Sequence, residues 1–304
     1  MFCLTFVLTS LTVTHKSSPL LFWGPTLIWA STWHVILYQL GEVPVINSVA
    51  WRFALAAVLL GLWAAQRKES LRLPRSAHLL MAATGIVQYS GNYVSVYAAE
   101  EHIPSGLVAV LFCLMVFGNA LSGQLFFKHR VTRRFLMACC GGVAGVVMIF
   151  WPEIAATGAR PGAMLGVGLG LLAVSAACIG NVLTLTLTQR KLPLVPVLSW
   201  SMGYGALFLV LLASVNGTGL HFELRPAYVL SLCYLAVFGS VLAFVLYFKL
   251  AQAQGPARAA LTGVVIPVIA LIISALFEGW QPSVLSVAGM ALCLGSIFAA
   301  TRLR

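Results

Sequence analysis

The sequence predicts an all-α membrane protein with ten transmembrane helices, arranged as two inverted five-helix repeats. First, 61% of the 304 residues are hydrophobic and only 8% are charged, whereas a soluble protein carries about 25% charged residues. Second, apolar runs recur along the chain, and a bilayer core about 30 Å thick needs roughly 20 residues per helix. Third, Lys and Arg gather in alternate connections, which orients such helices in a membrane.

The expected helices are separated by short connections rich in Pro, Gly and charged residues. They cover residues 20–40, 45–65, 77–99, 104–127, 132–151, 163–188, 194–215, 227–248, 257–278 and 283–301. The N-terminal segment 1–18 is too short for a further span. It also lacks a basic region ahead of its apolar run, so we expect no cleaved signal peptide. The first repeat is then 19–152 and the second 153–304.

The basic residues predict the topology. Of the 18 Lys and Arg residues, all but Arg52, Arg160 and Arg225 fall on one side of the expected bundle. The positive-inside rule places both termini in the cytoplasm of a multi-pass plasma-membrane protein, the inner membrane if the cell is bacterial. The net charge of +11 is therefore a topology signal, and we expect the lipid bilayer rather than nucleic acid as a partner.

A weak internal similarity supports the repeat. "YAAEEHIPSGLVAVLF" in the first half aligns with "KLAQAQGPARAALTGV" in the second, with Pro104 over Pro256. Each half holds an odd number of expected helices, so the halves cross the membrane in opposite directions. Inverted repeats of this kind are how many secondary transporters build two gates around one central site.

Two stretches resemble a known family. "FWGPTLIWASTWHV" with "VPVINSVAWRFALAAVLL" resembles the opening of EamA-type members of the drug/metabolite transporter superfamily, and "GPARAALTGVVIPVIALIISALFEGW" resembles their ninth helix. The resemblance implies ten helices and export of small metabolites, with the aromatic and broad-range amino acid exporters most similar. The fourth helix departs from the family pattern of Pro followed by Glu, with Met115 or Val116 and His129 at those places. The second half keeps Pro267 and Glu278, so the two half-gates are unequal.

Several function classes are disfavoured. The chain contains no Asp, no G-x-x-x-x-G-K-[ST] loop and no G-x-S-x-G or HExxH motif, and its Cys residues lack metal-ligand spacing. We therefore expect no enzyme activity, no cofactor and no metal site, and a small-molecule substrate. Two alternatives stay open, a multidrug or nucleotide-sugar carrier and a non-transporting membrane interaction protein. Nothing in the sequence indicates an oligomeric state.

The first candidate site is the polar stretch "QYSGNYVSVYAAEE" at 88–101. At 100° per residue, Gln88, Tyr89, Asn92 and Tyr93 fall on one half of the helix circumference. Gln88 and Tyr89, at the beginning of the stretch, are expected near the membrane centre. Unmet amides facing lipid cost kilocalories, so the stripe faces protein or a wet cavity. We favour a cavity wall that binds substrate over polar contacts that only join helices. Ser90 falls off this stripe.

Aromatic and charged residues extend the candidate site. Trp29 and Trp33 are one turn apart and either line a substrate pocket or pack in the core. Arg52, the one cation inside an expected span, either receives a substrate carboxylate or, the alternative we favour, extends to the outer interface or a loop Glu. Asn181 and Trp200 are the corresponding substrate-binding candidates of the second half.

Two prolines are candidate hinges, and one histidine is a candidate for proton transfer. Pro25 and Pro267 weaken helix backbones and are candidate hinges. His34 is a possible proton relay, although a structural role is favoured. Because Glu100 and Glu278 fall at helix ends, we expect no buried acid for proton exchange, and hence facilitated transport.

Overall fold

The computed structural model describes residues 19–115, 117–119, 133–156, 162–254, 259 and 262–302. The segment 1–18 and the residues Val116, His129, Arg160 and Pro256, named above, lie outside this description. All regular elements in the described ranges are helical. They agree with the predicted helices within a few residues at most ends.

The first half of the chain contributes nine described segments. They are α2 (Pro19–Ile36), η1 (Leu37–Gln39), α3 (Val45–Gln66), α4 (Arg75–Thr84), η2 (Gly85–Gly91), α5 (Asn92–Glu100), α6 (Ser105–Leu111) with η3 (Phe112–Leu114), and α8 (Arg133–Ala156). The α4, η2 and α5 segments form one continuous helix whose middle, η2, has π geometry.

The second half repeats this order of long and interrupted helices. Its described segments are α9 (Ala163–Gln189), α10 (Leu194–Val215), α11 (Pro226–Tyr234), η4 (Leu235–Leu242), α12 (Ala243–Gln254), α14 (Thr262–Phe277) and α15 (Val284–Arg302). Here too the middle of a continuous helix, η4 between α11 and α12, is a π segment.

Helix length and apolarity define a multi-pass membrane protein. Within the described residues, five helices are long and apolar enough to cross a bilayer: Pro19–Gln39, Val45–Gln66, Ala163–Thr184, Leu194–Val215 and Pro226–Ala253. Shorter apolar helices cover Ser105–Asn119, Met137–Pro152, Val265–Phe277 and Val284–Ser296. Large apolar side chains such as Leu79 and Val284 are 81% and 89% exposed, as expected for a surface that faces lipid.

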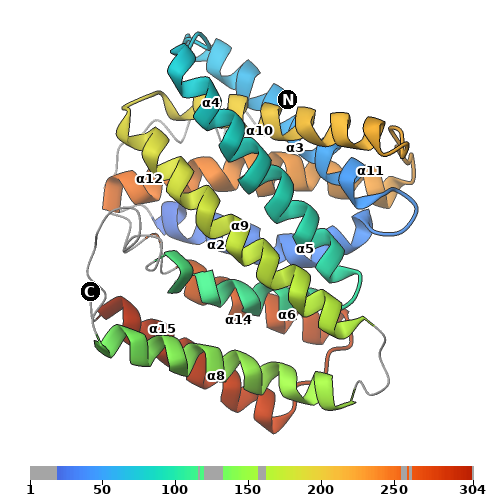
Figure 1. Ribbon diagram of the computed structural model, residues 1–304, viewed down its shortest axis with the longest axis vertical. Coiled ribbons are helices and arrows are strands. Elements are labelled where there is room, and N and C mark those ends of the chain that lie inside the picture. Colours follow the sequence, from blue (N-terminus) through green and yellow to red (C-terminus); the bar gives the residue numbers. More distant parts are fainter. Residues whose placement is uncertain are drawn as a thin grey trace.

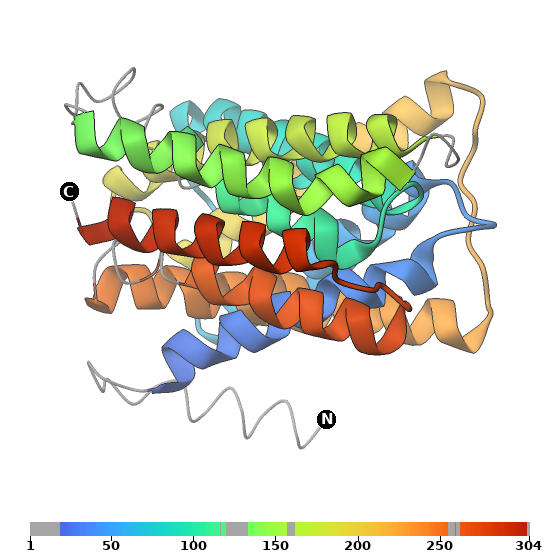
Figure 2. The same ribbon diagram turned by 90° about the horizontal axis from the view of Figure 1, so that it is seen from below.

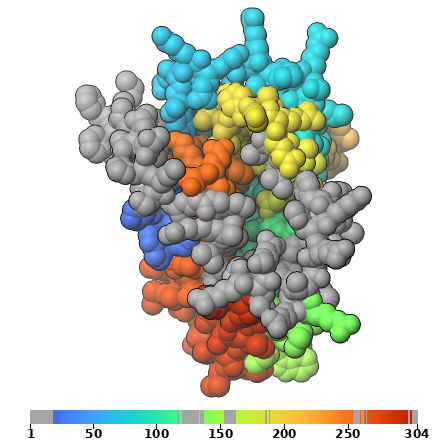
Figure 3. All heavy atoms as spheres, turned by 90° about the vertical axis from the view of Figure 1, so that its left-hand side faces the viewer, coloured from blue at the N-terminus to red at the C-terminus, as the bar shows by residue number. Residues whose placement is uncertain are grey.

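The helices run roughly side by side along one axis, and they pair across the two halves of the sequence (Figures 1 and 2). α3 lies against α10 near one edge of the bundle, and α8 lies against α15 at the opposite edge. Between these pairs, α5 contacts α9, and α2 contacts both α12 and α14. At the end where α3, α9 and α15 finish, segments from both halves share the surface (Figure 3).

Small residues allow the α8–α15 pair to approach closely. A Cβ on Gly145 would lie 2.6 Å from the Gly289 carbonyl oxygen, and a Cβ on Gly289 would lie 2.6 Å from the Gly145 carbonyl oxygen. The spacing of Gly141 and Gly145 is therefore explained by helix packing.

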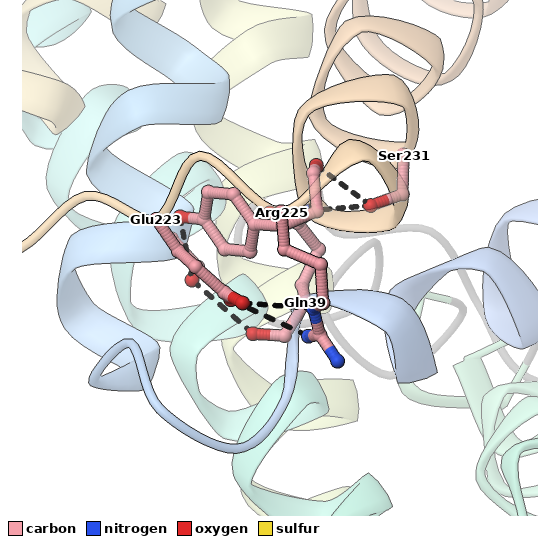
Figure 4. Close-up of polar contacts among 6 residues, drawn as sticks. Gln39, Glu223, Arg225 and Ser231 are labelled. Carbon is pink, nitrogen blue, oxygen red and sulfur yellow. Dashed lines mark hydrogen bonds and ion pairs between the residues drawn. The ribbon is translucent and has the colours of Figure 1, made fainter.

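At the end of the bundle opposite the C-terminus, side-chain hydrogen bonds hold neighbouring helix ends together. Gln39 Nε2 donates to the Tyr228 carbonyl oxygen at 2.8 Å and to Ser231 Oγ at 2.5 Å, which fixes the end of η1 to α11 (Figure 4). Nearby, Arg225 and Glu223 form an ion pair at 2.8 Å.

Candidate functional site

Both π segments are held by a serine. Ser90 Oγ donates to the carbonyl oxygen of Gly85 at 3.2 Å, and Ser240 Oγ donates to that of Leu235 at 3.0 Å. Each hydroxyl thus reaches the carbonyl five residues back, which is the spacing of a π turn. Such turns interrupt the α-helical ladder and often lie at functional sites.

Arg52 on α3 is the centre of the buried polar cluster. Its side chain is 1% exposed. Nε donates to Ser240 Oγ at 3.0 Å, and Nη1 donates to the Tyr97 hydroxyl at 3.3 Å. The guanidinium carbon lies 4.6 Å from the centre of the Tyr93 ring, a cation–π distance.

The favoured expectation for Arg52 was wrong. The side chain does not extend to the outer interface, and no carboxylate in the described residues lies within ion-pair distance of it. The physical reason is η4: a Cβ on Gly239 would lie 3.1 Å from Arg52 Nη2, so a glycine in the π segment makes room for the guanidinium. Arginine is suited to such a site because its planar group can bond and stack at once.

Gln88 and Asn92 are buried on η2 and at the start of α5, on the same continuous helix as Tyr93 and Tyr97. Their side chains are 8% and 4% exposed. The amide oxygen of each, Gln88 Oε1 and Asn92 Oδ1, has no hydrogen-bond donor among the described residues. An acceptor buried in this way costs about 1–3 kcal/mol unless something bonds to it. These two oxygens are therefore acceptors whose bonding capacity the described residues do not use.

The structure divides the predicted stripe among several neighbours. Gln88 packs against Gly180 of α9, where a Cβ would overlap its side chain, whereas Tyr89 and Tyr93 pack against Phe53 of α3 at 5.2 and 4.8 Å between ring centres. Ser90 donates to the Gly205 carbonyl oxygen of α10 at 2.9 Å. The prediction assumed 100° per residue, and the π turn at 85–91 breaks that periodicity.

An aromatic cluster adjoins Arg52. Tyr89 and Trp29 both pack on Phe244 of α12, at 5.4 and 5.2 Å between ring centres. Trp29 Nε1 also donates to the Gly239 carbonyl oxygen in η4 at 3.1 Å. Trp33, one turn further, packs on Phe112 instead, and its Nε1 is buried without a partner in the described residues. Trp29 therefore belongs to the cluster around Arg52, and Trp33 faces η3.

His34 takes part in a different contact, at the end of the bundle. Its Nδ1 lies 3.0 Å from Glu278 Oε1. Glu278 also accepts bonds from the Ser105 backbone N–H at 3.0 Å, Ser105 Oγ at 2.5 Å and Ser274 Oγ at 3.0 Å. One carboxylate thus joins α2, α6 and the end of α14. Gly279, with φ of 69°, ends α14 directly after it and is typical of a helix C-terminus.

The expectation that no acid is buried was wrong. Glu100, the last residue of α5, is 6% exposed, and the Glu278 side chain is 8% exposed. Their positions at helix ends were predicted correctly, but the neighbouring helices cover both. Tyr97, one turn before Glu100, is 0% exposed and bonded to Arg52.

The remaining candidates lie elsewhere. Asn181 Nδ2 donates to Asn119 Oδ1 at 3.2 Å, joining α9 to helix Ser105–Asn119. Trp200 is partly exposed and donates to the Leu71 carbonyl oxygen at 2.9 Å, beside a His78–Tyr204 hydrogen bond of 2.8 Å. The structure does not bring Trp200 to the Arg52 cluster.

The two candidate hinges are both inside helices. Pro25 is buried in α2. Pro267 lies in α14 next to a small apolar space shared with Cys113 and Cys293.

Sequence reasoning missed Phe244 and Glu100 as members of the buried clusters. Tyr93, Tyr97 and Glu100 are spaced i, i+4, i+7, which is the signal of a shared helix face. Nothing in the sequence pairs Ser240 with Arg52, because the two residues are 188 positions apart.

Comparison with known proteins now identifies the family. The model of the EamA-like transporter family matches twice, over residues 16–151 and 164–302. The chain belongs to this family and is a membrane transporter of the drug/metabolite transporter superfamily.

Its relatives include Protein PagO of Salmonella typhimurium, 23% identical over 275 residues that cover 88% of this chain and 87% of PagO. The uncharacterized inner membrane transporter YedA of Escherichia coli K12 is 28% identical, covering 81% of this chain and 78% of YedA. One solved crystal structure superposes with a TM-score of 0.69 at 17% identity, covering 93% of this chain and 96% of that one. This last likeness shows the fold alone.

Proposed function

We propose that this protein is a secondary transporter of the bacterial inner membrane that exports amino acids or similar small metabolites by alternating access. It crosses the membrane ten times as two inverted five-helix repeats, with both termini in the cytoplasm. The substrate passes the region between the π segments η2 and η4.

The observation that carries the proposal is the unmet bonding capacity at the centre. Gln88 and Asn92 offer buried amide oxygens without donors, and Arg52 offers a buried guanidinium without a carboxylate among the described residues. A protein whose polar groups only joined helices would use these atoms in interhelical bonds. A transporter leaves them for a ligand that binds and departs.

These groups fit a zwitterion. A guanidinium binds a carboxylate through paired N–H donors, and the amide oxygens accept from an ammonium. The rings of Tyr89, Trp29 and Phe244 supply apolar surface for a variable side chain. An amino acid presents all three kinds of group.

The helix contacts support the inverted repeat. The first π segment, η2, packs on α10 of the second half, and η4 packs on α3 of the first half. Each half thus places its third helix against the second helix of the other. The pairs α3–α10 and α8–α15 likewise join corresponding helices, as a two-fold axis in the membrane plane requires.

Counterflow in proteoliposomes tests the substrate class. Proteoliposomes that contain the purified protein are loaded with one unlabelled amino acid at a time. Uptake of the labelled amino acid is then compared with uptake by liposomes without protein. We expect exchange with several neutral amino acids, strongest for aromatic ones. Exchange of nucleotide sugars or cationic drugs, but of no amino acid, would support the alternative of a multidrug or nucleotide-sugar carrier. No exchange of any of these compounds would favour a non-transporting membrane interaction protein.

Cysteine accessibility tests the topology separately. Cysteines replacing Arg72 and Arg133 should react with impermeant maleimide only from the cytoplasm, and one replacing Glu42 only from outside. Reaction of positions 42 and 72 from the same side would contradict the inverted repeat.

A further inference from the structure

Glu100 is a carboxylic acid in an unusual setting. Both of its oxygens are buried and have no hydrogen-bond donor among the described residues. Its neighbour in sequence, Glu101, is exposed. A buried carboxylate without a donor or a paired cation is strongly unfavourable, so such a group either binds a cation or is held neutral by a proton.

The nearest charged groups do not neutralise it. Arg52 and Glu278 both lie close enough to Glu100 for electrostatic interaction, but Arg52 is bonded to Ser240 and Tyr97. No ion pair between Arg52 and Glu100 is present in the described residues.

The two neighbouring carboxylates have opposite surroundings. Glu278 accepts from Ser105 N–H, Ser105 Oγ and Ser274 Oγ and contacts His34, so its carboxyl group is surrounded by hydrogen-bond donors. Glu100 has no such donors. When two nearby acids are surrounded so differently, the one without donors holds the proton.

The elements packed on Glu100 bring few other titratable groups. α5 itself contributes Tyr97 and Tyr93, while the described parts of α6 and α9, both packed on α5, contain no charged residue. His102 follows in the connection and lies against Gly162. α3 also packs on α5 and contributes Arg52, and His34 of α2 contacts Glu278. The electrostatic balance at this end therefore depends on Glu100, Glu278, Arg52 and His34.

We propose that Glu100 is a proton-binding site that controls opening of the outer end of the transporter. Uptake of a proton from outer water forms an O–H bond on Glu100, leaves it neutral and permits the closed packing seen here. Loss of that proton to outer water leaves Glu100 as a carboxylate within electrostatic range of the Glu278 carboxyl group. Their repulsion, and the attraction of Glu100 to Arg52, then separate α5 from the α6–α14 contact.

The sign of the pH dependence follows. The closed form holds one proton more than the open form, so raising the pH favours opening. A difference of one proton changes the ratio of open to closed forms by at most about tenfold per pH unit. This effect needs no substrate, so it can be measured even if the proposed amino acid class is wrong.

The test uses the full-length chain with Val96→Cys, a buried position one turn before Glu100. Right-side-out membrane vesicles are treated with impermeant maleimide at a series of pH values. The reaction time at each pH is scaled to the fraction of a free cysteine that is thiolate, and labelling at position 96 is read by mass spectrometry. Asn216→Cys, which is exposed at the same end, reports sidedness and the intrinsic reactivity of the reagent at each pH.

We expect labelling at 96, relative to 216, to rise with pH. Glu100→Gln should abolish the rise and keep labelling low, because the amide cannot lose a proton. Glu100→Asp should retain the rise, and Glu101→Gln should behave like the parent. A pH-dependent rise that survives in Glu100→Gln, an equal effect of Glu101→Gln, or no rise in the parent would overturn the proposal.

Discussion

The π segments η2 and η4 share a backbone device, but their side chains differ. In each, a Ser hydroxyl bonds to the carbonyl five residues back. In η2 the neighbouring side chains are amides and Tyr, and Ser90 also bonds a neutral carbonyl of α10. In η4 the residues beside Ser240 are Phe238 and Gly239, and Ser240 accepts from the guanidinium of Arg52. The two π segments thus have the same backbone geometry but different polar contacts.

This difference shows how a repeat protein builds one asymmetric site. Gly239 offers no side chain, and that absence lets Arg52 enter from α3. The polar amides come from the first repeat, while the second repeat supplies close-packed small residues that receive the charge. A duplicated scaffold therefore needs few substitutions to distinguish its two halves.

The largest effect is expected at the charge itself. Arg52→Gln should lower transport by about a hundredfold, or ~2.7 kcal/mol in transition-state terms, because it removes the guanidinium that we propose binds the substrate carboxylate. Counterflow with the best amino acid of the panel measures it. Arg67→Gln, an exposed cation at the opposite end of α3, is the control and should transport normally. Wild-type exchange in Arg52→Gln would remove Arg52 from the substrate path.

Replacing the two serines should reduce the stability of the protein by different amounts. Ser240→Ala removes an acceptor from a charged donor and should cost about 1.5–3 kcal/mol, whereas Ser90→Ala removes neutral bonds and should cost about 0.5–1.5 kcal/mol. Thermal melting of the purified variants compares them. Equal melting points for the two would show that Arg52 does not depend on Ser240. Ser90→Ala should keep near-normal transport.

Close approach of η2 to α10 gives the next prediction. A Cβ on Gly85 would overlap the Ser201 carbonyl oxygen and lie 2.7 Å from Gly205 N. Gly85→Ala should therefore destabilise the protein by about 1–3 kcal/mol through overpacking, read as a lower melting temperature. Gly168→Ala is the matched control, since nothing lies within 4 Å of its Cβ position, and it should melt as the parent does or slightly higher.

A smaller loss of transport than in Arg52→Gln is expected at the amides. Gln88→Leu and Asn92→Leu should each reduce counterflow about tenfold, or ~1.4 kcal/mol, with melting temperature nearly unchanged because their oxygens bond to no described donor. Phe238→Leu, at the corresponding place in η4, should transport normally, since Phe238 is exposed and stacks on Tyr234. A lower melting point with normal transport in Asn92→Leu would instead favour a role in joining helices.

The sequence by itself determined the class of protein and the order of its helices. Apolar length and alternate basic connections are local properties, and a bilayer translates them directly into helices. For the same reason Gln88 and Asn92 could be recognised as buried polar groups before any contact was known.

Only the tertiary structure decided which polar groups meet. The π turn in η2 breaks the 100° periodicity on which the predicted stripe depended, so Gln88 and Tyr89 face different helices. Arg52 and Ser240 are 188 positions apart, and no local pattern joins them. Glu100 stands at a helix end next to the exposed Glu101, and its burial follows from how neighbouring helices cover that end, because burial is a property of the packed bundle and not of a residue's place in its own helix.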